Sequence, residues 1–139
     1  MKSLQVIDYS EAKKIVDLII EKASSLQKSI AVAVVDSHGE LIAFARMDGV
    51  PFPSINIAIN KAYTAARARK PTQEIGEKVR HPEKGYDIAY HGDPKFVGWG
   101  GGVPVLRNGE VVGAVAVSGL SAAEDADLAA SGVGMIAGQ

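Results

Sequence analysis

Apolar residues recur at helical spacing in the first part of the chain and gather in short β-type runs immediately after it. Asp8 is a predicted helix N-cap, and Glu11 stands at the position three residues later that completes a capping box. The apolar stripe that follows predicts a helix over residues 9–27. Segments 30–36 and 40–47 are rich in aliphatic residues and flank a short polar turn, so they predict a β-hairpin.

A second hairpin is predicted in the last third of the chain. Segments 103–107 and 110–118 flank Asn108-Gly109, whose tolerance of positive φ favours a two-residue type I′ turn. Ser121 with Glu124 then forms a predicted capping box for a helix that reaches about residue 136. Within that helix, Gly132 and Gly134 lower helix propensity but permit close approach of a neighbouring element.

The alanine-rich segment between the two hairpins predicts a helix that packs closely on a sheet. Ser54 is its predicted N-cap, and Pro71 ends it and starts a shorter helix through about Arg80. One face is apolar and narrow, with Ile55, Ala58, Ile59, Ala62, Ala65 and Ala66. The opposite face carries Asn56, Asn60, Thr64 and Arg67, with Lys61 on its flank.

The resulting order of elements is α-β-β-α-α-β-β-α. Hairpins without a parallel crossover favour an antiparallel sheet with flanking helices, so we assign the chain to the α+β class. Its 139 residues contain no linker or low-complexity segment, and we expect one domain over residues 1–139.

Charge and composition narrow the classes of partner. Lys plus Arg total 15 and Asp plus Glu total 16, so no overall field attracts nucleic acid or an anionic membrane. The chain has no cysteine, which excludes disulfides and thiolate chemistry. Neither a signal-type N-terminus nor an apolar stretch of membrane-spanning length is present, and we expect a cytoplasmic protein that does not insert into membranes.

The long connection over residues 81–102 gathers aromatic and histidine side chains. Tyr86, Tyr90, Phe96 and Trp99 lie there with His81 and His91. Such a set is typical of an apolar cofactor pocket or of haem-iron ligation, and the alternative is that these residues pack the loop onto its own domain or a neighbouring subunit. The two histidines lack the spacing of a zinc motif. The glycines over 98–102 precede a strand, which favours a flexible hinge or close backbone approach over a phosphate loop.

A second set of reactive side chains comes from the turn and helix over 46–72. Asp48 can accept a proton, and Lys61 and Arg67 can bind an anion. The alternative is a turn aspartate, an exposed lysine and a surface arginine, because charged residues mostly face solvent.

The combination of motifs resembles the GlcG/HbpS family over nearly the whole chain. The matching segments are 31–36, 44–49, Lys61-Ala62-Tyr63-Thr64-Ala65, Pro71-Thr72, 101–104, 109–114, 117–119 and Asp125. The resemblance implies a profilin-like α+β fold, assembly into homo-oligomers, and haem or corrinoid as ligand, as in the related C-terminal domain of PduO-type proteins.

The sequence is consistent with three functions. The leading hypothesis is a haem- or other tetrapyrrole-binding protein, with cofactor contacts from Lys61, Arg67, His81, His91, Tyr90 and Trp99 and with His81 or His91 as metal ligand. The second is an isomerase or lyase for an organic acid, with Asp48, Lys61 and His91 as candidate catalytic residues. The third is a noncatalytic oligomeric accessory protein.

Overall fold

The computed structural model describes residues 1–137, so the last two positions of the predicted domain lie outside the described residues. The order of elements agrees with the prediction and adds a short 3-10 helix, η1, in the long connection. The elements are α1 (Tyr9–Ser25), β1 (Ala31–Asp36), β2 (Leu41–Arg46), α2 (Pro53–Ala68), α3 (Thr72–Val79), η1 (Ile88–His91), β3 (Gly102–Arg107), β4 (Glu110–Ser118) and α4 (Ala122–Ala137).

The four strands form one antiparallel sheet in the order β2-β1-β4-β3. Each predicted hairpin supplies one edge strand and one central strand. The β3–β4 turn places Asn108 at φ 53° and Gly109 at φ 78°, which confirms the predicted turn with positive φ at both central residues. Asp8 caps α1 by accepting from Glu11 N at 2.9 Å, and Ser121 and Glu124 form the predicted capping box on α4.

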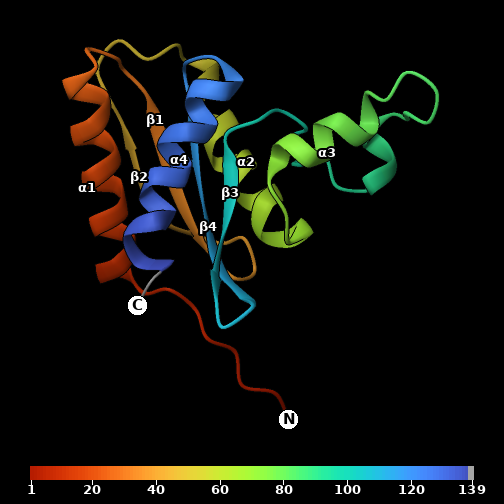
Figure 1. Cartoon of the computed structure of the whole chain (residues 1–139), viewed down its shortest axis with the longest axis horizontal. Helices are drawn as coiled ribbons and strands as arrows, with labels where there is room; N and C mark the ends of the chain where they lie inside the picture. The colour runs from red at the N-terminus through yellow and green to blue at the C-terminus, as the bar shows by residue number, and fades with distance from the viewer. Residues whose placement is uncertain (138–139) are drawn as a thin grey trace.

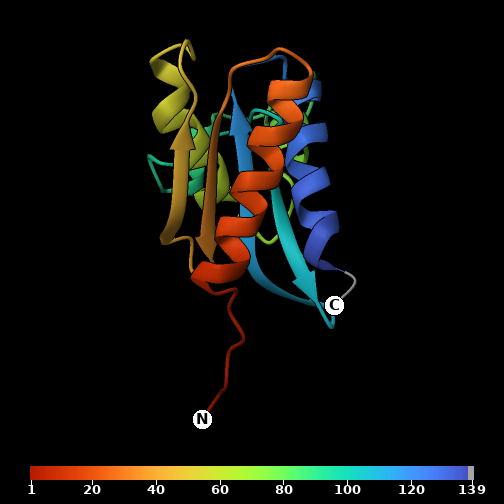
Figure 2. The ribbon, with the colours of Figure 1, turned by 90° about the vertical axis from the view of Figure 1, so that its left-hand side faces the viewer.

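Helices cover both faces of the sheet (Figures 1 and 2). Helices α1 and α4 pack on one face, where valines alternate inward from the central strands. Helix α2 packs on the other face, where Ala33 and Ala116 meet Ala62 and its neighbouring alanines. The small side chains on both sides of this second interface confirm the predicted close packing of α2 on the sheet.

Helix α2 begins two residues earlier than the sequence predicts. Pro53 is its first residue, Phe52 precedes it without a side-chain cap, and Ser54 lies buried inside the first turn. The prediction of Ser54 as N-cap is therefore wrong. Proline favours the first helical position because its φ is already helical and its missing N–H has no intrahelical partner there.

The two glycines of α4 lie in opposite environments, so substitution by alanine is expected to have opposite effects on stability at the two positions. A Cβ on Gly132 would lie 2.6 Å from Ile19 Cδ1, whereas a Cβ on the exposed Gly134 would meet nothing within 4 Å. We expect Gly132→Ala to lower the free energy of unfolding by about 1–3 kcal/mol through overpacking. We expect Gly134→Ala to raise it by up to about 1 kcal/mol through helix propensity. Urea unfolding of both variants checks this, and a loss of stability in Gly134→Ala would contradict it.

Among the described residues, no helix combines the length and the apolar character needed to cross a bilayer.

Candidate functional site

Lys61 is the largest fully buried side chain among the described residues. Its Nζ lies 3.1 Å from Oδ2 of Asp125 on α4 and donates to the carbonyl of Val117 on β4, also at 3.1 Å. The two side chains are 1% and 2% exposed. The expectation that Lys61 flanks a polar, exposed face of α2 is therefore wrong, because β4, α4 and the start of β3 cover it.

Burial and attraction act in opposite directions on this ion pair. Removal from water lowers the pKa of the Lys61 ammonium and raises the pKa of the Asp125 carboxyl, while the attraction between the two charges opposes both shifts. Oδ1 of Asp125 also accepts from the backbone N–H of Leu120 at 3.0 Å, which fixes the carboxylate. Burial therefore brings the charged and neutral forms of the pair closer in energy.

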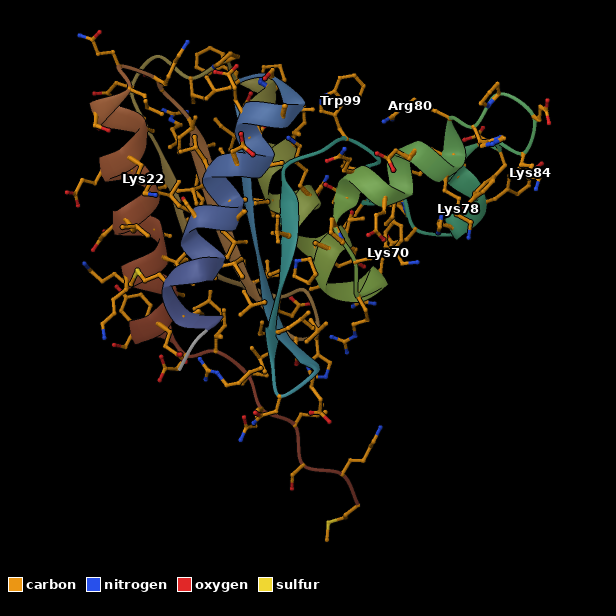
Figure 3. All side chains as sticks on the ribbon, viewed as in Figure 1. Lys22, Lys70, Lys78, Arg80, Lys84 and Trp99 are labelled. Carbon is orange, nitrogen blue, oxygen red and sulfur yellow. The ribbon has the colours of Figure 1, made fainter. Side chains whose placement is uncertain are left out.

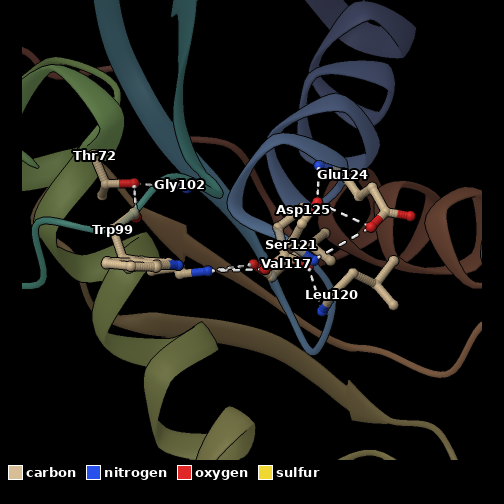
Figure 4. Close-up of polar contacts among 9 residues, drawn as sticks. Thr72, Trp99, Gly102, Val117, Leu120, Ser121, Glu124 and Asp125 are labelled. Carbon is tan, nitrogen blue, oxygen red and sulfur yellow. Dashed lines mark hydrogen bonds and ion pairs between the residues drawn. The ribbon is translucent and has the colours of Figure 1, made fainter.

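The pair lines a pocket of about 440 Å³, which we call the Lys61 pocket. Such a volume lies within the usual range of small-molecule sites. Its walls come from α2, from the connection before β3, and from the end of β4 with the start of α4 (Figure 4). The lining includes Ser54, Ile57, Val97, Trp99, Gly119 and Leu120 beside the charged pair.

Buried threonine hydroxyls fasten the long connection at the edge of this pocket. Thr64 Oγ1 accepts from Val97 N at 3.0 Å. Thr72 Oγ1 donates to the carbonyl of Trp99 at 2.7 Å and accepts from Gly102 N at 2.9 Å (Figure 4). Thr64 was expected on a polar face, and it is buried because the connection packs over that side of α2. These bonds hold the half-exposed Trp99 at the pocket edge.

A second pocket, also of about 440 Å³, lies between α3 and the connection around η1, and we call it the His91 pocket. Its lining consists of Ala68, Lys70, Glu74, Ile75, Lys78, Tyr86, His91 and Phe96, so one carboxylate lies there with the two lysines. Nε2 of His91 lies 3.0 Å from the Tyr86 hydroxyl, and the His91 and Phe96 rings are 5.3 Å apart between centroids. Figure 3 shows Lys70 and Lys78 on one side of α3 and Trp99 on the other, so the two pockets open on different sides of this helix.

The structure separates the remaining candidate residues from both pockets. Asp48 is exposed in the turn after β2, and Tyr90 is 83% exposed. His81 is exposed and its Nδ1 accepts from two backbone N–H groups of its own turn. The Arg67 Nε donates to the carbonyl of His38 at 2.9 Å, and its guanidinium lies over the Tyr63 ring at 4.8 Å. Of the candidate residues, Lys61 and Trp99 line the Lys61 pocket together, and His91 alone lines the His91 pocket.

Several residues of the two pockets were missed as site residues. Asp125 was recognised only as part of a family motif, and Lys70 and Lys78 were not predicted as site residues. Tyr86 and Phe96 were recognised as loop aromatics, but their pairing with His91 depends on how the connection turns at η1. A local signal existed for Lys61, which lies three residues after Ala58 and four before Ala65 and thus on the buried stripe of α2.

Within residues 1–137, histidine and acidic side chains do not gather in a group of three or more that could hold a metal ion. Haem iron needs fewer protein ligands than a zinc or calcium site, because the porphyrin supplies the others.

The family model described as haem degrading protein HbpS-like matches residues 7–134. The chain belongs to the GlcG/HbpS family. An uncharacterised 15.0 kDa protein of the dhaT-dhaS intergenic region of Citrobacter freundii is 37% identical over 130 residues, which are 92% of each chain. Protein GlcG of Escherichia coli K12 is 34% identical over 118 residues, which are 85% of each chain. The family resemblance of the sequence is thereby confirmed.

Solved structures agree with this assignment. The crystal structure of protein ORFY of Klebsiella pneumoniae superposes with a TM-score of 0.91 at 29% identity, covering 96% of this chain and 92% of that one. A PduOC:haem complex superposes with a TM-score of 0.87 at 28% identity, covering 94% of this chain and 95% of that one. These neighbours share the antiparallel sheet with flanking helices.

Proposed function

We propose that this protein binds haem in the His91 pocket. Membership of a family described as haem degrading and the likeness to a PduOC:haem complex support haem as the ligand. The location of the haem site is supported by the pair formed by His91 Nε2 and the Tyr86 hydroxyl, which lie 3.0 Å apart on the wall of this pocket. Imidazole nitrogen and phenolate oxygen are both side-chain ligands of haem iron in proteins.

The other walls of the pocket fit the remaining parts of haem. The half-buried Phe96 supplies apolar surface for the porphyrin, with the 3% exposed Ile75 beneath it, and the Phe96 ring already packs against His91. Lys70 and Lys78 supply ammonium groups for the two propionates. The bound group would supply iron-centred redox chemistry, and the residues of this chain would hold and orient it.

Lys61 and Arg67 are less suited to hold the propionates. The Lys61 ammonium is buried and already bonded to Asp125 and Val117, so a propionate would have to displace a buried carboxylate. The Arg67 guanidinium lies against His38 and Tyr63 and does not line the His91 pocket. We therefore assign the propionate contacts to Lys70 and Lys78.

Assembly into homo-oligomers is part of the same proposal. The exposed side chains include Phe52, Tyr90 and Trp99, which are 78%, 83% and 54% exposed in the single chain. Exposed aromatic residues are typical of subunit contacts. Sedimentation velocity tests this, and a single species with the mass of one chain at micromolar concentration would contradict it.

Titration of the purified apoprotein with hemin, followed in the Soret region, tests the proposal. We expect a saturable change with one haem per chain. Cobalamin is titrated in parallel, because corrinoid is the alternative tetrapyrrole ligand. Absence of a saturable Soret change would reject haem, and saturable binding of cobalamin alone would transfer the proposal to corrinoids.

Reversal of charge at the pocket rim is expected to weaken hemin binding. In Lys70→Glu/Lys78→Glu, the carboxylates repel the propionates, and we expect the dissociation constant to rise about three- to tenfold at low salt. The matched control is Lys22→Glu/Lys84→Glu, which makes the same change of net charge at residues outside the His91 pocket. An equal loss of affinity in both variants would show an effect of net charge only and would contradict the assigned propionate contacts.

A further inference from the structure

The Lys61 pocket has no part in the proposed haem site, yet it contains a buried amine and a buried carboxyl at one point of its wall. Lys61 Nζ and Asp125 Oδ2 are 3.1 Å apart, and both residues line the pocket. Most surface ion pairs are free to rearrange, but this one is fixed by Val117 and Leu120, which hold the remaining polar atoms. A proton can therefore pass between Nζ and Oδ2 without movement of either side chain.

The rest of the pocket wall indicates the size and character of a ligand. Ser54, Ile57 and Lys61 are spaced by three and four residues, so they share one side of α2. The first turn of α2 has no side-chain cap and no acidic residue, so the partial positive charge of its N-terminus is not offset there. Apolar side chains of Val97 and Leu120 complete the wall. The pocket thus has the Lys61–Asp125 pair in its wall at one end, with the Lys61 side chain only 1% exposed, apolar side chains along it, and an end that favours a negative group.

We propose that the Lys61 pocket binds a small oxo acid and that Lys61 forms an imine with its carbonyl carbon. Asp125 takes a proton from the Lys61 ammonium, and the neutral amine adds to the carbonyl carbon as its C=O π electrons move to oxygen. Asp125 returns its proton to that oxygen, which becomes the hydroxyl of a carbinolamine. Asp125 then takes a second proton from the nitrogen and passes it to this hydroxyl, which leaves as water when the C=N bond forms, so that Asp125 ends ionised and the imine nitrogen keeps one proton. The step needs no oxidant or reductant, and water is its only by-product.

The lowered pKa of Lys61 supports this role. A lysine with a lowered pKa has a larger neutral fraction at a given pH, by about tenfold for each unit, than exposed lysines have. Removal from water is the cause, since the attraction of Asp125 acts in the other direction. Reaction at neutral pH should therefore select Lys61 over the surface lysines.

Reductive trapping tests the proposal on the intact protein. The protein is incubated with glyoxylate and cyanoborohydride at neutral pH, and the modified lysines are located by peptide mass spectrometry. We expect Lys61 to be carboxymethylated severalfold faster than the exposed Lys22 and Lys84. Modification of Lys61 no faster than these internal references would overturn the imine. Propanal serves as a carbonyl compound without a carboxylate, and an equal preference for Lys61 with propanal would overturn the oxo acid as ligand class.

Two variants show whether the reagent enters through the pocket. Ile57→Trp fills the pocket next to Lys61, whereas Ile55→Trp places the same ring on a half-buried position of α2 outside the pocket. We expect Ile57→Trp to slow the modification of Lys61 severalfold and Ile55→Trp to leave it unchanged. Equal rates of Lys61 modification in the two variants would assign the reaction to local unfolding and would contradict entry of the reagent through the Lys61 pocket. Hemin is absent from these experiments, so their outcome is independent of the haem proposal.

Discussion

We expect Lys61→Met to lower the free energy of unfolding by about 3–5 kcal/mol. The variant keeps a long unbranched side chain in α2 but leaves the Asp125 carboxylate buried without its counter-charge, and it removes a donor to the Val117 carbonyl. The cost arises from the charge left unpaired in a region from which water is excluded. Urea unfolding at one fixed protein concentration measures it.

Two further variants distinguish this cause from a loss of packing. In Lys61→Met/Asp125→Asn the remaining partner is neutral and still accepts from Leu120 N, so we expect much of the lost stability to return. Lys13→Met removes one partner of the exposed pair Lys13–Asp17, and we expect no measurable change in the free energy of unfolding of this variant. A double variant less stable than Lys61→Met alone would contradict the explanation by an unpaired charge.

The second large effect is expected at Gly101, which lies beside the same ion pair. Its φ is +136°, and a Cβ built there would lie 2.6 Å from the Val117 carbonyl oxygen and 2.7 Å from Lys61 Nζ. We expect Gly101→Ala to lower the free energy of unfolding by about 2–6 kcal/mol, because backbone strain and steric overlap each contribute about 1–3 kcal/mol.

Gly109→Ala is the matched control for Gly101→Ala. Gly109 also has a positive φ, of +78°, but a Cβ there would meet nothing within 4 Å, so only the strain remains. We expect a loss of about 1–2 kcal/mol in this variant. Equal losses in the two variants, measured by urea unfolding, would contradict the close approach at Gly101. The structure itself confirms that the glycines of the 98–102 segment permit such an approach.

The fold was largely predictable because its signals are local. Alternation of valine with alanine along β1 and β4 assigns the two faces of the sheet, and the alanine stripe of α2 identifies the face that receives it. Asn108-Gly109 determines the β3–β4 turn through its own φ preferences. These features depend on few residues, which lie close together in the chain.

The site was less predictable because its signals are long-range. Lys61 lies on the buried stripe of α2 by its spacing, but a charged residue is expected at the surface unless a partner is known, and Asp125 follows 64 residues later. The pairing of Tyr86 with His91 requires the course of the connection around η1. Similarly, Thr64 is buried only because Val97 and its neighbours cross α2.

Haem binding in the His91 pocket is the central proposal, and two matched double variants test it most directly. His91→Ala/Tyr86→Phe removes both proposed iron ligands of the His91 pocket. His81→Ala/Tyr90→Phe makes the same chemical changes at exposed positions of the same connection outside that pocket. Both proteins share the same composition, so non-specific effects of the substitutions cancel.

Hemin titration of these two variants, followed in the Soret region beside the unsubstituted protein, is the decisive measurement. We expect the dissociation constant of His91→Ala/Tyr86→Phe to rise at least about tenfold with loss of the ligated Soret band, because replacement of residues that only support a metal ligand already costs that much. We expect His81→Ala/Tyr90→Phe to bind hemin as the unsubstituted protein does. Unchanged binding by His91→Ala/Tyr86→Phe would contradict the account.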